Sequence, residues 1–253
     1  MAFEIPPWIG PDSFFASLPW DILMAIIMGV SGIIALVLGA SLIKKYRKSK
    51  SRVALFLGLA LLTFIVAMFV ILPTLFITGG LFKIMDDLVA RLVGLIAITF
   101  YLVFAIELFI PRTEQRRGHT IIPLVFISIN ALLITLNFAH VLTVFLNSGS
   151  INTFPTLLIV QEFLVTLPFL YIAYNSRKLS GKAPKEAERK ALRFISWSGV
   201  FMFLSYLFLA IDDLLVLDNF SALPMWLFAM LGFIYFYIGV ARPERVFKKP
   251  QGD

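Results

Sequence analysis

Seven long apolar stretches, separated by short polar segments, account for most of the chain. They cover residues 22–43, 53–82, 87–110, 120–146, 151–176, 192–215 and 220–241. A helix needs about 20 mostly apolar residues to cross the hydrocarbon core of a bilayer. We therefore expect an all-α integral membrane protein built as a seven-transmembrane helix bundle.

Breaks between the stretches carry residues that interrupt or end helices. Lys44-Lys45 follows the first stretch, Gly79-Gly80 marks the turn after the second, and Pro111 ends the third. The polar run Asn147–Ser150 separates the fourth stretch from the fifth, and Pro243 stops the seventh. Glycine and proline at such places favour turns.

The basic residues predict the orientation in the membrane. All but two of the 22 Lys and Arg residues follow the first, third, fifth and seventh stretches. Lys and Arg accumulate in cytoplasmic loops. We therefore expect a multi-pass protein of the cell membrane, with its N-terminus outside and its C-terminus in the cytoplasm.

The chain accordingly divides into three parts. Residues 1–20 contain no Lys or Arg but include Trp8 and Trp20, so they are expected to form an extracytoplasmic interfacial segment. They lack the basic region of a signal peptide, so cleavage is not expected. Residues 21–242 form the seven-helix domain, and residues 243–253 form a cytoplasmic basic tail.

The amino-acid composition and the placement of the basic residues indicate which partners the protein contacts. Apolar residues make up 60% of the chain and charged residues 15%, whereas soluble domains contain about 25% charged residues. The net charge of +7 lies in short loops beside the membrane. Such loops favour contact with anionic lipid headgroups, and no nucleic-acid partner is expected.

An internal duplication is one interpretation of two similar segments. Residues 41–56, after the first stretch, resemble residues 175–194, after the fifth. Prolines also follow the third and seventh stretches, in residues 109–112 and 240–245. A 3+1+3 parallel repeat would give both resemblances, and sugar transporters of the SWEET type are similar in size and plan. The alternative is that cytoplasmic loops are generally basic and helix ends generally accept proline.

Glu162 is the strongest candidate for a ligand-binding residue. It lies about eight residues into the fifth stretch, or about 12 Å below the outer boundary. A carboxylate at this depth is costly unless it is protonated or paired. It could bind a proton, a cation or an amine, or it could form a packing hydrogen bond to a neighbouring helix.

Charged residues near the outer boundary are further candidates. Asp87 and Arg91 are four residues apart on one helical face, so an ion pair between them is expected. Asp212 and Asp213 lie near the same boundary, as do Asp86 and Asp218. They are either an acidic vestibule for a cation or basic ligand, or solvated helix ends.

The fourth stretch carries Asn130, Asn137 and His140 on nearly one helical face. This polar stripe is expected to face the bundle interior, either for hydrogen bonds between helices or for contact with a ligand. Glu107, close to the inner surface, is expected to pair with loop arginines. The first stretch has a small-residue face, including Gly29 and Gly39, for close helix packing.

No motif for a catalytic or cofactor site is present in the chain. The P-loop, zincin, nucleophile-elbow and Rossmann patterns are absent, as is cysteine, and histidine occurs only twice. Neither a metal nor a cofactor is expected. An enzyme that uses intramembrane carboxylates is not excluded, but no catalytic pair supports one.

The end of the seventh stretch, Tyr235 to Arg245, resembles the exit of prokaryotic seven-helix sensor regions that precede histidine kinases. The resemblance covers this segment and the topology. It implies a sensor whose output passes through a separate cytoplasmic protein, since only a short tail follows. A retinal protein is not expected, because the seventh stretch contains no lysine.

Three functions remain open on the sequence. The first is a receptor- or sensor-like module that binds a small ligand from the outer side and signals to a cytoplasmic partner. The second is a small-solute or ion transporter in which Glu162 is the coupling carboxylate. The third is a scaffold subunit of a membrane complex.

Overall fold

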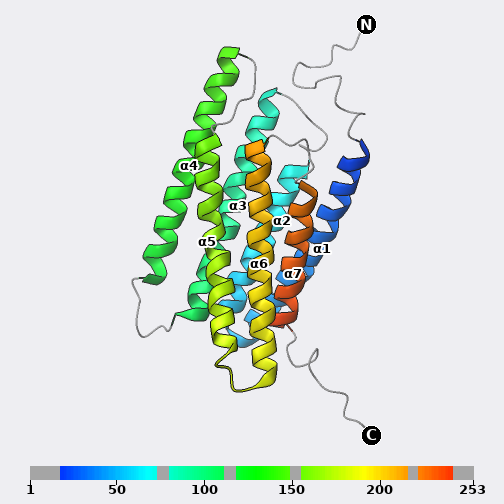
Figure 1. The fold of residues 1–253 in the computed structure, drawn as a ribbon, viewed down its shortest axis with the longest axis vertical. Helices are drawn as coiled ribbons and strands as arrows, with labels where there is room; N and C mark the ends of the chain where they lie inside the picture. Colours follow the sequence, from blue (N-terminus) through cyan, green and yellow to red (C-terminus); the bar gives the residue numbers. More distant parts are fainter. Residues whose placement is uncertain (1–17, 73–79, 111–117, 149–154, 216–221, 242–253) are drawn as a thin grey trace.

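The computed structural model describes residues 18–72, 80–110, 118–148, 155–215 and 222–241. These residues form seven α-helices and no strand (Figure 1). The helices are α1 (Leu18–Ser49), α2 (Arg52–Ile71), α3 (Gly80–Phe109), α4 (Gly118–Ser148), α5 (Pro155–Ser180), α6 (Glu186–Leu215) and α7 (Ala222–Ala241). All seven are long and apolar enough to cross a membrane, which agrees with the expected polytopic membrane protein.

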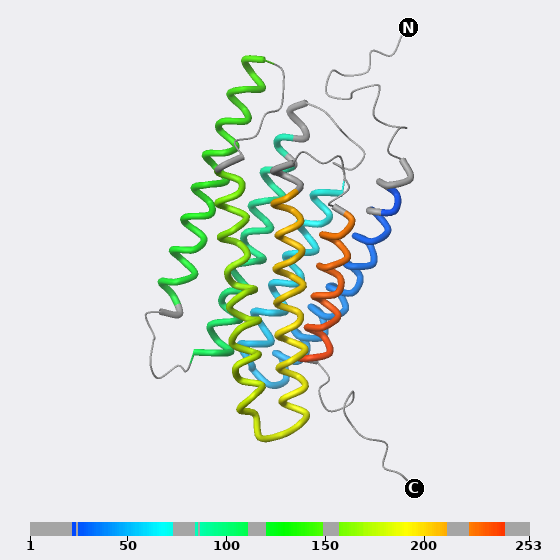
Figure 2. Tube along the Cα trace, in the orientation of Figure 1, coloured from blue at the N-terminus to red at the C-terminus, as the bar shows by residue number. Residues whose placement is uncertain are grey.

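Six of the helices form a ring around a common core. Consecutive helices run in opposite directions (Figure 2). The ring follows the order α1, α2, α3, α5, α6, α7, and it closes because α7 packs against α1 and α3 packs against α5. Helix α4 packs outside the ring on α3 and α5, at the edge of the bundle in Figure 1. Only 22% of its apolar window is buried, against at least 33% for the other helices.

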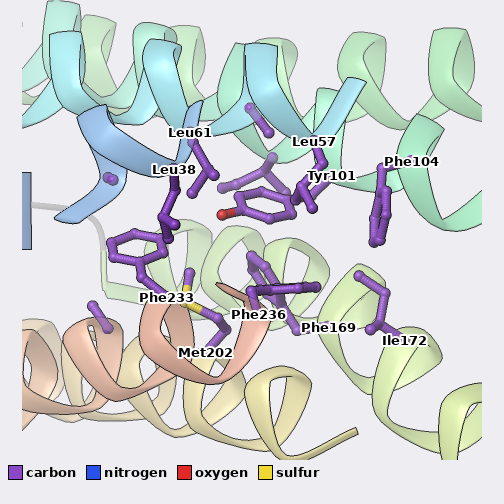
Figure 3. Packing of buried hydrophobic residues seen from close by; sticks show 14 of the residues in the cluster. Leu38, Leu57, Leu61, Tyr101, Phe104, Phe169, Ile172, Met202, Phe233 and Phe236 are labelled. Carbon is purple, nitrogen blue, oxygen red and sulfur yellow. The ribbon is translucent and has the colours of Figure 1, made fainter. Parts of the chain in front are cut away.

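Aromatic rings fill the centre of the ring. Tyr101, Phe104, Phe169, Phe233 and Phe236 are each at most 1% exposed. Figure 3 shows Tyr101 facing Phe236 and Phe169, while Phe233 lies beside Leu38. The Tyr101 ring lies 5.3 Å from that of Phe169 and 5.7 Å from that of Phe236. Such edge and offset contacts stabilise aromatic clusters beyond the burial of their area. The core is therefore continuous from α3 across to α5 and α7.

Small residues bring neighbouring helices close together. A Cβ atom added to Gly39 of α1 would lie 3.3 Å from the backbone oxygen of Gly58 in α2. Between α5 and α6, the Ser196 hydroxyl donates a 2.8 Å hydrogen bond to the backbone oxygen of Ala173. Gly29, by contrast, has no heavy atom within 4 Å of its added Cβ and is exposed. The expected small-residue face of α1 therefore includes Gly39 but not Gly29.

The second stretch is shorter than the sequence predicts. Helix α2 ends at Ile71, not near residue 82, and residues 80–82 already belong to α3. The last backbone bond runs from the Leu72 amide to the Met68 oxygen. Pro73 has no amide hydrogen with which to continue the series. Hydropathy alone could not place this boundary, because the residues on both sides are apolar.

Helices α1 and α6 extend beyond their apolar stretches into charged segments. Helix α1 continues through the basic run to Ser49, and α6 starts at Glu186 instead of residue 192. The first turns of α6 are supported by an ion pair between Lys190 and Glu186, with N–O distance 2.8 Å. Pairs at this spacing stabilise exposed helices, so charged ends extend the helices beyond the apolar part.

Candidate functional site

A cavity of about 150 Å³ opens between five helices at one end of the ring. It is lined by residues from the last part of α2 and α6 and from the first part of α3, α5 and α7. In an antiparallel bundle these parts meet at the same end. The basic connections from α1 to α2 and from α5 to α6 lie at the opposite end (Figure 1). The cavity therefore faces away from the basic side.

Glu162 of α5 lies at the inner wall of the cavity and is only 2% exposed. Its Oε1 atom accepts a 2.8 Å hydrogen bond from the Nη1 atom of Arg91, in α3. The sequence predicts that a carboxylate at this depth is protonated or paired, and the structure gives it a guanidinium partner. The two residues of the pair are 71 positions apart in the chain, so the pair joins α3 to α5 over a long sequence separation.

Arg91 also binds Asp87, one turn earlier on α3. Its Nε atom donates to both carboxylate oxygens of Asp87, at 3.1 and 2.9 Å. The predicted ion pair at this spacing is thus confirmed. Side-chain exposure rises from 2% for Glu162 to 16% for Arg91 and 47% for Asp87. The guanidinium therefore connects a buried carboxylate with one near the surface.

Gln161 is a cavity residue that the sequence reasoning missed. It is 4% exposed and lines the cavity beside Glu162, and its Oε1 atom has no hydrogen-bond partner. A buried acceptor without a partner costs about 1–3 kcal/mol. The available signal was its position in an apolar stretch, where a polar side chain is itself unusual.

Apolar side chains make up most of the remaining wall. Phe64 and Trp226 lie on one side, with ring centroids 6.3 Å apart. Tyr206 stacks on Phe169 at 5.5 Å and so connects the cavity with the aromatic core. Gly94 lines the cavity, and a Cβ atom added to it would meet no heavy atom within 4 Å. The space beside Gly94 is therefore open.

The polar residues of α4 lie apart from this cavity. Asn130 and Asn137 are 1% and 6% exposed, and His140 is partly buried, so the stripe does face inward. The Nδ2 atom of Asn130 donates to the Phe126 oxygen of its own helix at 2.9 Å. None of the three residues lines the cavity. Their contact with a ligand stays a prediction.

The structure leaves several acidic candidates undescribed. Asp212 and Asp213 belong to α6, but their side chains lie outside the described residues, as does the side chain of Asp86. Asp218 lies wholly outside them.

Glu107 lies at the basic end of the bundle, away from the cavity. Its carboxylate pairs with the guanidinium of Arg52 at an N–O distance of 3.8 Å, which confirms the expected pairing with an arginine.

The described charges at the cavity sum to one negative charge. Arg91 carries a positive charge, whereas Asp87 and Glu162 each carry a negative one when ionised. Within the described parts of the chain, no group of histidine and acidic residues could hold a metal ion. The arrangement is chemically suited to hold a ligand that donates hydrogen bonds and has an apolar body.

No protein-family model, curated protein or solved structure matches the chain. The resemblance to kinase-linked sensor regions consequently stays a prediction.

Proposed function

We propose that the protein is a receptor- or sensor-like membrane module that binds a small ligand in the cavity between α2, α3, α5, α6 and α7. The observation that carries this proposal is the buried pair of Arg91 and Glu162 beside open space. Charged groups at membrane depth are costly and generally mark functional sites. A pair that served packing alone would not need a cavity next to it.

The closed far side of the cavity favours binding over passage. Below Tyr206, the rings of Phe169, Tyr101 and Phe236 are fully or almost fully buried and in mutual contact. They fill the path toward the basic end. A transporter with Glu162 as its coupling carboxylate is the second candidate, because this buried residue lies where a solute would bind. Uptake into sealed vesicles separates the two functions.

The proposed orientation puts the cavity on the outer side of the cell membrane. The opposite end exposes basic side chains of α1, including Lys44, Arg47 and Lys48. On α5 it exposes Arg177 and Lys178. This end would contact anionic lipid headgroups in the cytoplasmic leaflet. It would also receive a separate cytoplasmic partner.

The route of the signal would run along α6 and α7. Both helices line the cavity and reach the basic end. They are joined on the way by a 2.7 Å hydrogen bond from the Ser198 hydroxyl to the Gly232 oxygen. A ligand that moves the outer end of this pair would shift the inner end as a rigid unit, as happens in helix-shift switches.

The proposed 3+1+3 repeat has support from two matching helix contacts. Gly39 and Gly58 lie two residues outside the segment 41–56, and they meet in the α1–α2 contact. Ala173 and Ser196 lie two residues outside the segment 175–194, and they meet in the α5–α6 contact. The first is a close approach of two backbones and the second is a hydrogen bond from a side chain to a backbone oxygen, so the two hairpins correspond in the position of these contacts but not in their kind.

A thermal-shift screen against metabolites tests the binding function. Gly94→Leu places a side chain in the cavity without touching its charges, and Gly29→Leu puts the same change where no atom is near. A ligand at 100 times its Kd adds about 2.7 kcal/mol of stability. We expect a shift in the wild type and in Gly29→Leu that is lost in Gly94→Leu. No shift by any compound would reject the proposal.

A further inference from the structure

We infer that the ligand of this cavity is an organic monocation, with one ammonium group on an apolar body of single-ring size. The inference rests on the proposed binding function and adds the chemical class of the ligand. It has three independent supports, namely charge, an acceptor without a partner, and the shape of the apolar wall.

The charge balance favours a cation. The described cavity side chains include two carboxylates, Asp87 and Glu162, and one guanidinium, Arg91, which contacts both, so their formal charges sum to one negative charge. Attraction between unit charges grows as the surroundings become less polar. A monocation would neutralise the site, an uncharged ligand would leave the excess unchanged, and an anion would increase it.

The amide oxygen of Gln161 is a buried acceptor that a ligand with a hydrogen-bond donor would satisfy. It is buried in the cavity wall without a partner, and it is adjacent in sequence to Glu162. An ammonium group has three N–H donors and no acceptor. It can therefore bind the Gln161 oxygen and a carboxylate at the same time. A carboxylate group offers no donor to this oxygen.

The apolar wall sets the size of the body. An apolar cavity of about 150 Å³ can hold benzene, and this cavity has about that volume. The rings of Phe64, Trp226 and Tyr206 line it, and aromatic faces attract cations as well as other rings. The open space at Gly94 admits the body without a clash.

The inferred ligand is a soluble amine, because the ethanolamine headgroup of a lipid also carries a phosphate and is zwitterionic. The test uses the full chain in phosphatidylcholine nanodiscs and three single-ring probes: benzylammonium, benzyl alcohol and benzoate. We expect benzylammonium to bind about tenfold more tightly than the other two, because its hydrogen bonds are charge-assisted. Adding phosphatidylethanolamine should leave this binding unchanged, and weaker binding would show that a zwitterionic lipid headgroup competes for the cavity, which would overturn the monocation assignment.

Variants separate the ligand class from the site. Asp87→Asn removes the excess charge while Arg91 keeps Glu162, and we expect it to abolish the preference for benzylammonium over benzyl alcohol. Gly94→Leu should abolish binding of all probes, and Gly29→Leu should leave the binding of every probe unchanged.

Other outcomes would also overturn the inference. If benzoate or benzyl alcohol binds as well as benzylammonium, or if Asp87→Asn keeps the preference, the ammonium assignment is wrong while the cavity remains a binding site. Binding of benzylammonium that survives Gly94→Leu would place it outside the cavity and overturn the inference. If no probe binds, the ammonium assignment also falls, and the metabolite screen then decides whether the cavity binds any ligand.

Discussion

The guanidinium of Arg91 donates to the buried Glu162 through Nη1 and to the half-exposed Asp87 through Nε. One cation thus ties α3 to α5 and connects the interior of the bundle to its surface. The cavity lies next to this connection, so a ligand that contacts the acidic groups would act on the α3–α5 contact as well.

Removing the cation should be more harmful than removing the whole pair. Arg91→Met leaves Glu162 buried without its guanidinium, and breaking a buried pair costs about 3–5 kcal/mol. Arg91→Met combined with Glu162→Leu should recover most of that loss, because apolar residues often replace buried pairs without penalty. Unfolding in mixed micelles measures both. A double variant as unstable as the single one would show that the pair itself supplies the stability.

The close α5–α6 contact should not tolerate a methyl group. A Cβ atom at Gly199 would lie 2.7 Å from the Phe169 backbone oxygen, and helix backbones cannot yield easily. Overpacking of this kind costs about 1–3 kcal/mol, so Gly199→Ala should lower the midpoint of thermal unfolding. The control is Gly29→Ala, which has open space and should stabilise α1 through helix propensity. Equal effects of the two variants would contradict this packing.

Asn130 should be dispensable for ligand binding. Its Oδ1 atom is buried without a partner, and the residue does not line the cavity. Asn130→Leu removes an unsatisfied acceptor, so we expect unchanged or higher stability and an unchanged Kd for any cavity ligand. A large loss of affinity would show that the polar residues of α4 contribute to ligand binding.

The proposed orientation can be tested with single cysteines, because the chain contains none. Ser49 at the end of α1 and Asn147 near the end of α4 are both exposed, at opposite ends of the bundle. In intact cells, a membrane-impermeant maleimide should label Asn147→Cys and leave Ser49→Cys unlabelled until the cells are opened. The reverse pattern would invert the topology and place the cavity on the cytoplasmic side.

Sequence reasoning predicted those features that depend on local order along the chain. Seven apolar stretches give seven helices, and the spacing of Asp87 and Arg91 gives their ion pair. The partner of Glu162 could not be predicted, because it depends on how α3 and α5 pack and turn toward each other. Spacing along α4 showed that Asn130 and Asn137 share a face, but it could not show that α4 lies outside the ring.

The boundary of α2 and the role of Gln161 have a similar explanation. Apolar residues on both sides of Pro73 concealed the end of the helix, and the uncharged residues 80–82, which begin α3, extended the apparent second stretch. Gln161 precedes Glu162, whose charge is the stronger sequence signal for a functional residue. The side chain of Gln161 nevertheless lines the same cavity. Whether a polar residue faces a cavity or a neighbouring helix follows from packing, not from composition.

The reaction rate of a cysteine at position 94 tests the outward-open, negatively charged cavity most directly. Gly94→Cys has room for its side chain, and the exposed Asn147→Cys corrects for the intrinsic reactivity of each reagent. In intact cells, a cationic methanethiosulfonate reagent should react with Gly94→Cys faster than an anionic one, by about tenfold after correction, because a charged cleft concentrates counter-ions. Equal corrected rates, or reaction only after the cells are opened, would contradict the account.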